Sequence, residues 1–199
     1  MSDAGVAGLL LAAGAGRRMG GPKALLRDHD GVPFLHRAVG SLLSGGCAEV
    51  TVVLGAAEEQ ARALLDETGW STHDRIAVVH AADWGEGMGA SLRAGLTSLQ
   101  DSPVASALVS LVDLPDVDAR VVRRVLDASS GVRALARASY AGRPGHPVLI
   151  GRDHWPGVVS SAEGDRGARS YLEEHQPLLC ECGDLASGRD LDRPEDLRR

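Results

Sequence analysis

Aromatic side chains, net positive charge and long apolar stretches are all scarce in this chain of 199 residues. Aromatic residues make up only 3% of the sequence, so the core is expected to be aliphatic. The formal net charge of −6 argues against a nucleic-acid-binding protein, because such proteins need a basic face to neutralise phosphates. The apolar run over residues 6–13 is too short to span a bilayer and lacks the basic segment of a signal peptide. We therefore expect neither nucleic acid nor a membrane as a partner.

Cysteine is also rare, with three residues at Cys47, Cys180 and Cys182. Three cysteines cannot all pair within one chain, which is typical of proteins in a reducing compartment. Cys180 and Cys182 are separated by a single residue, which is not the usual spacing of a zinc-binding pair. These features predict incidental thiols and a cytoplasmic location.

Short apolar runs alternate with helix-patterned segments along most of the chain. Strands are expected at residues 6–11, 50–54, 76–79 and 105–112, and helices at 33–43, 58–65, 90–99 and 119–126. In the less regular last third, we expect strands at 132–139, 147–150 and 177–182, a helix at 169–174 and a turn at 142–145. The alternation predicts an α/β fold, a Rossmann-like three-layer sandwich with a mainly parallel sheet. Since no linker or repeat interrupts it, residues 1–199 are expected to form a single domain.

Glycine is abundant, with 25 residues, and it gathers after the first expected strand. Residues 11–23 read Leu-Ala-Ala-Gly-Ala-Gly-Arg-Arg-Met-Gly-Gly-Pro-Lys and combine four glycines with three cations. Glycines let backbone amides surround an anion, and arginine and lysine neutralise phosphate oxygens. The loop lacks the Gly-Lys-Ser/Thr of a Walker loop and the third glycine of a dinucleotide fingerprint. It therefore predicts a triphosphate site in preference to a solvated glycine-rich turn.

An aspartate directly follows the fourth expected strand. Asp113 begins the sequence Asp-Leu-Pro-Asp, and a carboxylate at the carboxyl end of a buried strand is well placed to bind Mg²⁺. The alternative is a turn that caps the next helix, a role that suits Asp116 and Asp118 better than Asp113. Asp113 is therefore the candidate metal ligand of this segment.

The pattern Leu-Ala-Ala-Gly-x-Gly-x-Arg-Met-Gly-x-Pro-Lys-x-Leu-Leu resembles a signature of nucleotidyltransferases with the molybdopterin-guanine-dinucleotide-synthase-like fold. The sequence is most similar to the molybdenum cofactor cytidylyltransferases, which implies a fold of the nucleotide-diphospho-sugar transferase type. The resemblance also implies the nucleotide-binding residues, which are Leu11, Ala12, Ala13, Gly14, Gly16, Arg18 and Lys23. Arg18, Lys23 and Asp113 are implied to be catalytic, whereas Arg17 occupies a variable position of the motif.

The same resemblance extends the metal site. It makes Asp113 of the Asp-x-Pro motif a ligand of Mg²⁺. Residues 190–197 resemble the closing motif of the family, with Arg193 in place of the usual threonine, and imply that Asp192 is a second metal or substrate contact. An alternative that is compatible with this role is a helix start, with Pro194 as the first helical residue.

Three later segments resemble family motifs on the acceptor side: a Gly-Met-x-x-Ser-Leu segment, a Gly-His-Pro motif and a Gly-Asp-x-Gly-Ala-Arg motif. The acceptor-binding residues that they imply are Ser91, His146, Asp165 and Arg169. Two plainer interpretations remain open: Ser91 in a capped core helix, and His146 as a satisfied loop histidine.

The function implied by the resemblance is Mg²⁺-dependent transfer of CMP from CTP to the molybdenum cofactor, with release of pyrophosphate. Residues 1–118 are expected to bind the nucleotide and residues 119–199 the acceptor, with a target molybdoenzyme as a further partner. The Ala12-Ala13-Gly14 version of the loop points to CTP, since guanylyltransferase relatives usually carry Ala-Gly-Gly. The alternatives are a GTP-dependent guanylyltransferase of the same cofactor, a sugar- or polyol-phosphate nucleotidyltransferase, and a nucleotide-binding chaperone for the cofactor.

Overall fold

Four parallel strands form one half of the sheet in the computed structural model, which describes residues 5–193 and 195–196. They are β1 (Val6–Leu11), β2 (Glu49–Leu54), β3 (Ile76–His80) and β4 (Ser106–Leu111). Leu11 of β1 is paired with Val53 of β2 on one side and with Leu111 of β4 on the other. From β1, the strands β2 and β3 follow in order toward one edge of the sheet, whereas β4 lies on the other side of β1. In open α/β sheets, such a switch point creates a ligand-binding crevice beyond the carboxyl ends of the strands.

The other half of the sheet is mixed. β5 (Leu135–Tyr140) and β6 (Arg143–Gly151) form an antiparallel hairpin, and β7 (Leu178–Glu181) is parallel to β5. β6 is also antiparallel to β4, which completes the order β3-β2-β1-β4-β6-β5-β7. The hairpin turn consists of Ala141 and Gly142, both at positive φ, the conformation that tight two-residue hairpins require. The turn expected at residues 142–145 was therefore wrong in its bounds, because residues 143–145 already belong to β6.

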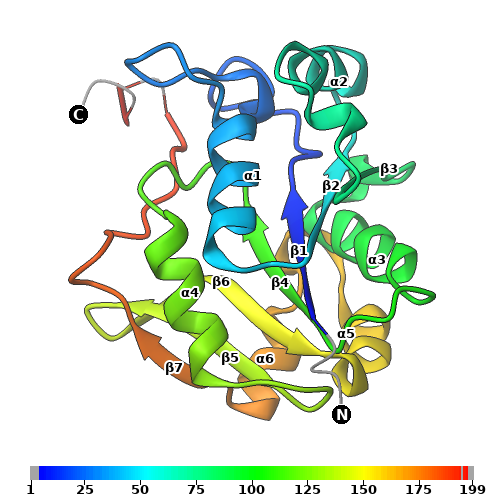
Figure 1. The fold of residues 1–199 in the computed structure, drawn as a ribbon, viewed down its shortest axis with the longest axis vertical. Coiled ribbons are helices and arrows are strands. Elements are labelled where there is room, and N and C mark those ends of the chain that lie inside the picture. The colour runs from blue at the N-terminus through cyan, green and yellow to red at the C-terminus, as the bar shows by residue number, and fades with distance from the viewer. Residues whose placement is uncertain (1–4, 194, 197–199) are drawn as a thin grey trace.

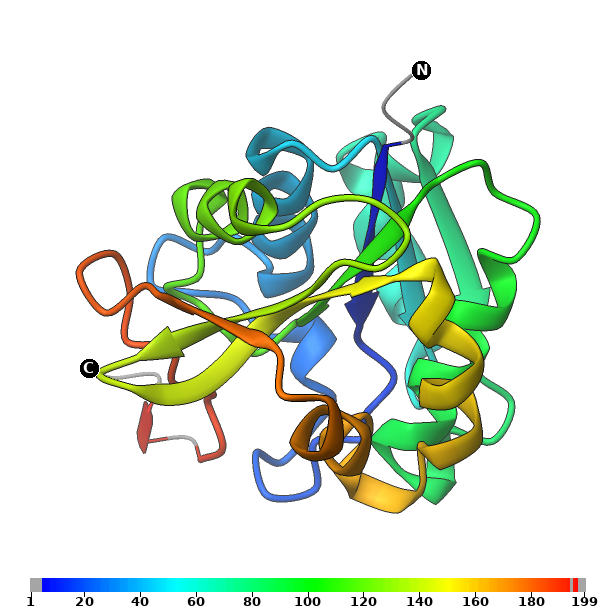
Figure 2. The same cartoon turned by 90° about the horizontal axis from the view of Figure 1, so that it is seen from below.

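Helices cover both faces of the sheet (Figures 1 and 2). One face carries α1 (Phe34–Gly45), α2 (Glu58–Glu67) and α4 (Ala119–Ala128), and the other carries α3 (Met88–Ser98), α5 (Trp155–Ser161) and α6 (Arg169–His175). The expected three-layer α/β sandwich with a mainly parallel sheet is thus confirmed. The sequence analysis missed α5, whose Pro156 and Gly157 weaken a helical pattern. Pro156 is tolerated because it lies in the first turn, where its missing N–H has no intrahelical partner.

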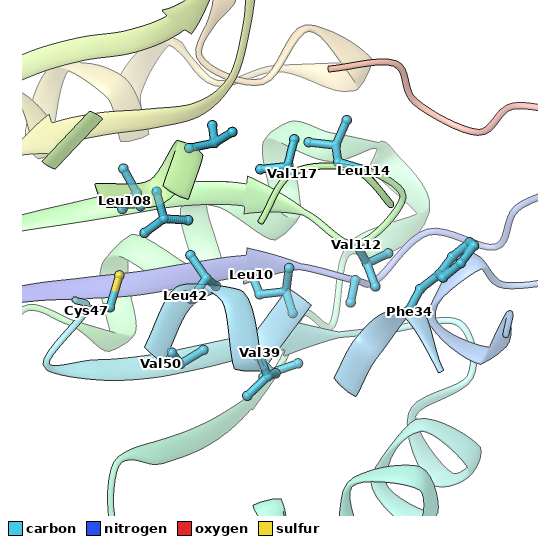
Figure 3. Close-up of a cluster of buried hydrophobic side chains, with 14 of the residues drawn as sticks. Leu10, Phe34, Val39, Leu42, Cys47, Val50, Leu108, Val112, Leu114 and Val117 are labelled. Atoms are coloured by element: carbon cyan, nitrogen blue, oxygen red, sulfur yellow. The ribbon is translucent and has the colours of Figure 1, made fainter. Parts of the chain in front are cut away.

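Two aliphatic clusters fill the space between the sheet and the helices. In the cluster drawn in Figure 3, Leu10 and Leu108 of neighbouring strands pack with Val39 and Leu42 of α1. A second cluster lies under α3, α5 and α6 and includes Leu9. Burial of each such side chain stabilises the fold by roughly 1.5–3 kcal/mol. Packing on both faces therefore fixes the strand ends from which the functional loops emerge.

The three cysteines are buried and unpaired within the described residues. Cys180 and Cys182 both point into the core, as the alternation of a strand requires. In the part of the chain that the structure describes, no helix is both long and apolar enough to cross a membrane.

Candidate active site

The loop after β1 starts inside the core and opens toward solvent. The Ala12 amide donates to a β2 carbonyl at 2.9 Å, and the Ala13 carbonyl accepts from an amide just beyond β2 at 3.0 Å. Leu11, Ala12 and Ala13 are buried, whereas Gly14 and Arg18 are exposed. The predicted nucleotide-binding residues thus begin as a buried segment that is hydrogen-bonded to the sheet and continue as a solvent-exposed loop.

The loop closes on Gly16. The amides of Met19 and Gly21 both donate to the Gly16 carbonyl, at 2.9 and 3.3 Å. Gly16 has a φ of +57°, and a Cβ atom there would lie 1.9 Å from the Gly21 carbonyl oxygen. Only glycine fits this position, so the sequence fixes a compact loop from which exposed backbone groups face solvent.

Lys23 stands where three distant parts of the chain meet. It opens the 3₁₀ helix η1 (Lys23–Leu25), and its Nζ lies 2.6 Å from Oδ2 of Asp113 and 2.8 Å from Oδ1 of Asp192. The Leu191 amide donates to the Asp113 carbonyl at 3.1 Å and holds the C-terminal segment beside the end of β4. In Figure 1 this segment, coloured orange to red, returns from β7 toward that end of the sheet. The structure therefore brings together Lys23, Asp113 and Asp192, three residues that the sequence analysis selected.

Burial and pairing act differently on the three charges. Burial disfavours the Lys23 ammonium, but its hydrogen bonds to both carboxylates outweigh that cost and raise the pKa of Lys23. Burial raises the pKa of Asp113, and the hydrogen bond from Lys23 offsets this only in part. The hydrogen bond from Lys23 lowers the pKa of Asp192, whose side chain is 48% exposed against 13% for Asp113. Asp113 is therefore the carboxylate whose ionised form depends most on a neighbouring cation.

A third carboxylate completes an acidic cluster. Oxygen atoms of Asp113, Asp190 and Asp192 lie within 4.8 Å of one another. Hard divalent cations bind such carboxylate oxygens together with phosphates and water, so this donor set fits a divalent metal ion. The sequence analysis did not select Asp190 as a ligand. The signal that could have revealed it is its alternation with Asp192, which directs both side chains to one side of an extended segment.

Arg18 and the closing motif border this cluster. Arg18 is exposed, and its charge contributes, after that of Lys23, to the lowered pKa of Asp192. Pro194, the expected first residue of a helix, lies outside the described residues. The Asp196 carboxylate accepts from the amides of Asp192 and Arg193, at 3.2 and 3.0 Å, and so fixes the turn that carries Asp192.

A pocket separate from the acidic cluster lies on the face of α3, α5 and α6 and has a volume of about 130 Å³. We call it the side pocket. Three of the four predicted acceptor-binding residues line it: His146, Asp165 and Arg169. Ser91 does not; it is buried in the first turns of α3. Leu11, at the base of the glycine-rich loop, also lines the side pocket, so the two sites adjoin.

Asp165 is held at this pocket by a close approach of two backbone segments. Gly87, just before α3, has a φ of +115°, and a Cβ atom there would lie 2.6 Å from Oδ1 of Asp165 and from the backbone of Gly164. A larger residue would push the two segments apart. The glycine-rich bend is therefore explained by contact with the Gly-Asp-Arg-Gly segment.

The side pocket also contains residues that the sequence analysis missed. Arg137 of β5 and Arg166 line it beside the predicted residues. Burial, and then the charge of Arg137, lower the pKa of His146 to about 4, so this imidazole is neutral at physiological pH. The signal that could have revealed Arg137 is its place between Ala136 and Ala138, where an expected strand turns a charged side chain to one face.

A family model and a curated relative each match most of this chain. The family model of the MobA-like NTP transferase domain matches residues 8–178. A curated relative, nicotine blue oxidoreductase of Paenarthrobacter nicotinovorans, is 39% identical over 204 residues, which cover 98% of this chain and 95% of that protein.

Solved structures share the whole fold. Rv0371c from Mycobacterium tuberculosis H37Rv superposes with a TM-score of 0.76 at 25% identity and covers 100% of this chain and 98% of its own. Another structure of that protein, with a TM-score of 0.73 at 25% identity, is a complex with manganese and covers 98% of this chain and 97% of its own. Molybdopterin-guanine dinucleotide biosynthesis protein A from Archaeoglobus fulgidus has a TM-score of 0.63 and covers 97% of this chain and 95% of its own. Its 15% identity supports likeness of fold alone.

Proposed function

The chain belongs to the MobA-like NTP transferase domain family and is a nucleotidyltransferase, and we propose that it transfers CMP from CTP to the molybdenum cofactor. The observation that carries the proposal is the contact of Lys23 with both Asp113 and Asp192 beside the loop after β1. This contact brings the glycine-rich loop, which is suited to a triphosphate, next to the carboxylate cluster at the switch point of the sheet. Nucleotidyl transfer needs this pairing of cations for phosphates with carboxylates for a metal ion.

In the proposed reaction, an oxygen of the acceptor's terminal phosphate attacks the α-phosphorus of CTP. The new P–O bond forms as the bond to the β-phosphate breaks, and pyrophosphate leaves with the electron pair. Lys23 and Arg18 neutralise charge on the triphosphate, and the amides of the loop orient it. No covalent enzyme intermediate is required, so the protein's main contribution is positioning.

Asp113 and Asp192, joined by Asp190, are the residues that we propose to hold a divalent ion, Mg²⁺ in the cell. A bound Mg²⁺ neutralises phosphate oxygens and polarises the phosphoryl group. The Lys23 ammonium pairs with two of these carboxylates, those of Asp113 and Asp192. Support for a divalent ion also comes from the manganese complex of the similar protein Rv0371c.

We propose CTP as the nucleotide because the loop reads Ala12-Ala13-Gly14, where guanylyltransferase relatives usually carry Ala-Gly-Gly. The acceptor is proposed to contact His146, Asp165 and Arg169 in the side pocket, and Ser91, which is buried in α3 and does not line that pocket, is the fourth proposed contact. Residues up to about 118 then serve mainly the nucleotide, and those beyond serve mainly the acceptor. The proposal includes a target molybdoenzyme as a partner and a cytoplasmic location, to which the three unpaired cysteines lend support.

The test is pyrophosphate release with each of the four ribonucleoside triphosphates and isolated molybdenum cofactor. We expect release with CTP and Mg²⁺, and none without the cofactor. Preferential release with GTP would replace CTP by GTP in the proposal. Binding of nucleotide and cofactor without release would favour a cofactor chaperone, and release only with a sugar or polyol phosphate would change the acceptor.

A second candidate function, that of an oxidoreductase, is favoured by the 39% identity to nicotine blue oxidoreductase. The loop does not have the glycine spacing of a dinucleotide fingerprint, which weighs against it. Nicotine blue with NADH or NADPH is the probe that separates the two functions. Reduction of the dye, with no pyrophosphate release under any condition, would favour the oxidoreductase.

A further inference from the structure

We propose that Arg137 and Arg169 bind an anionic group of the acceptor in the side pocket. This inference rests on the proposed transfer function and adds to it a specificity-determining residue, Arg137, together with a class of acceptor. The acceptor would be a molecule with an apolar body and an anionic oxygen group.

Arg137 occupies an unusual position for a charged residue. Its neighbours Ala136 and Ala138 point into the cluster under α1 and α4, so Arg137 points to the opposite face of the sheet. Leu135, two residues earlier on that face, packs with the cluster under α3, α5 and α6. An inward position of this kind normally carries an apolar side chain, because a half-buried charge costs free energy.

No carboxylate forms an ion pair with Arg137 among residues 5–193 and 195–196. Its Nε and Nη2 donate to the carbonyl of Gly145, at 3.2 and 3.1 Å. Burial lowers the pKa of Arg137, the nearby charge of Arg169 lowers it further, and the Glu173 carboxylate opposes this shift only in part. Two guanidinium groups therefore face the same space and repel each other, an arrangement that an anion between them would relieve.

The charged residues that line the side pocket carry a net positive charge. Arg166 adds a third positive charge and Asp165 a single negative one, while His146 is neutral. The floor is apolar, with residues such as Leu92 and Val148. A ligand with a flat or apolar body and an anionic end fits this combination of groups.

The side chain of Arg137 is directed toward the end of the sheet that carries the acidic cluster. Val148 of β6 lies opposite both Arg137 of β5 and Val109 of β4. Because β6 runs antiparallel to β4, Gly145, whose carbonyl accepts from Arg137, lies toward the carboxyl end of β4, after which Asp113 follows. An anionic group held at Arg137 therefore lies toward the edge of the sheet where the transfer is proposed to occur.

The first experiment uses inorganic phosphate as the probe, titrated into the full chain without nucleotide and followed by calorimetry. We expect Arg137→Gln to weaken this binding at least about tenfold, which is about 1.4 kcal/mol. Arg143→Gln, an exposed arginine of the same hairpin, is the matched control and should bind phosphate like the unmodified chain. Lys23→Ala should retain the binding, because Lys23 belongs to the other site. Loss in Lys23→Ala with retention in Arg137→Gln would overturn the proposal.

The second experiment measures steady-state kinetics with CTP and the molybdenum cofactor. We expect Arg137→Gln to raise KM for the cofactor about tenfold and to leave KM for CTP unchanged, with partial recovery in Arg137→Lys. A rise in KM for CTP alone, or equal loss in Arg137→Gln and Arg137→Lys with a lower melting temperature in both, would instead make Arg137 a nucleotide or hairpin residue. If no nucleotide supports transfer but phosphate binding still depends on Arg137, the transfer function fails while the anion site stands.

Discussion

The acidic cluster and the side pocket adjoin each other but differ in their balance of charge. In the acidic cluster, the single ammonium of Lys23 pairs with two of the three carboxylates, so the cluster keeps a net negative charge. In the side pocket, three arginines outnumber the single carboxylate of Asp165, so the lining keeps a net positive charge. The first site therefore favours a cation, and the second favours an anionic ligand. Metal binding and recognition of the acceptor are thus assigned to different parts of the crevice.

The largest effect is expected from removing the cation of the acidic cluster. Lys23→Ala should lower the turnover number for pyrophosphate release with CTP by about 100- to 1000-fold, because a preorganised charge at the transferring phosphates is lost. Asp113→Ala should have an effect of the same order. Circular dichroism should show a retained fold in both variants, since the core clusters do not involve these residues.

Arg17→Ala is the matched control for Lys23→Ala, because Arg17 is an exposed cation of the same loop that occupies a variable position. Its turnover number should match that of the unmodified chain. Near-normal turnover in Lys23→Ala would remove Lys23 from the mechanism and with it the distinction between the two sites.

Gly16→Ala should distort the glycine-rich loop without removing a charged side chain. Alanine at a φ of +57°, with its Cβ directed at the Gly21 carbonyl, forces the loop to open. We expect kcat/KM for CTP to fall by about 10- to 30-fold, equivalent to about 1–2 kcal/mol of strain. Gly21→Ala, where no atom lies within 4 Å of the added Cβ, should have little effect on kcat/KM. Equal effects of the two substitutions would show that backbone conformation is not what Gly16 contributes.

A smaller effect is expected from Asp192, which is half exposed. Asp192→Asn should raise the Mg²⁺ concentration for half-maximal activity about tenfold, because two carboxylates of the acidic cluster remain. Removal of divalent ions by EDTA should abolish turnover in the unmodified chain, and added Mg²⁺ should restore it. An unchanged Mg²⁺ requirement in Asp192→Asn would exclude Asp192 from the metal site.

The last prediction concerns the stability of the fold in acid, and it tests the environment of His146 in the side pocket. The pKa of His146 is about 4 in the fold and about 6.5 when unfolded, so the unfolded state binds more protons between these values. Stability contributed by neutral His146 is therefore complete above pH 6.5 and lost as the pH falls toward 4. We expect a loss of about 2 kcal/mol in the free energy of unfolding between pH 7 and 5, and its absence in His146→Gln. The charged groups that line the side pocket with His146 are Arg137, Arg166, Arg169 and Asp165. Identical pH profiles in urea denaturation would contradict the expectation.

Much of the fold could be predicted because its strands are short apolar runs. Leu10, Val52 and Leu108 lie on strands buried on both faces, and such strands are visible in sequence without knowledge of their partners. The bounds of β6 and the existence of α5 could not be predicted in the same way. They depend on the left-handed pair at Ala141 and Gly142 and on packing of α5 against α3, which overrides a weak local pattern.

The functional sites were predictable to the extent that their residues lie in local motifs. The glycine-rich loop and Asp113 each follow a recognisable strand, so their common location at one edge of the sheet follows from topology. The contact between Lys23 and Asp192 spans 169 positions, and no local signal encodes it. Arg137 belongs to none of the motifs, and its significance emerges only when the sheet shows which face it occupies.

The anchoring of Asp192 by the bond between the Leu191 amide and the Asp113 carbonyl has a consequence for biosynthesis. All strands that the structure describes have been translated once residue 181 has left the ribosome. All residues of the sheet are therefore available before Asp192, a partner of Lys23, is synthesised. A nascent chain that has reached only the end of β7 has every strand of the sheet and an incomplete acidic cluster. The order in which the ribosome delivers residues thus puts completion of the acidic cluster after synthesis of the sheet.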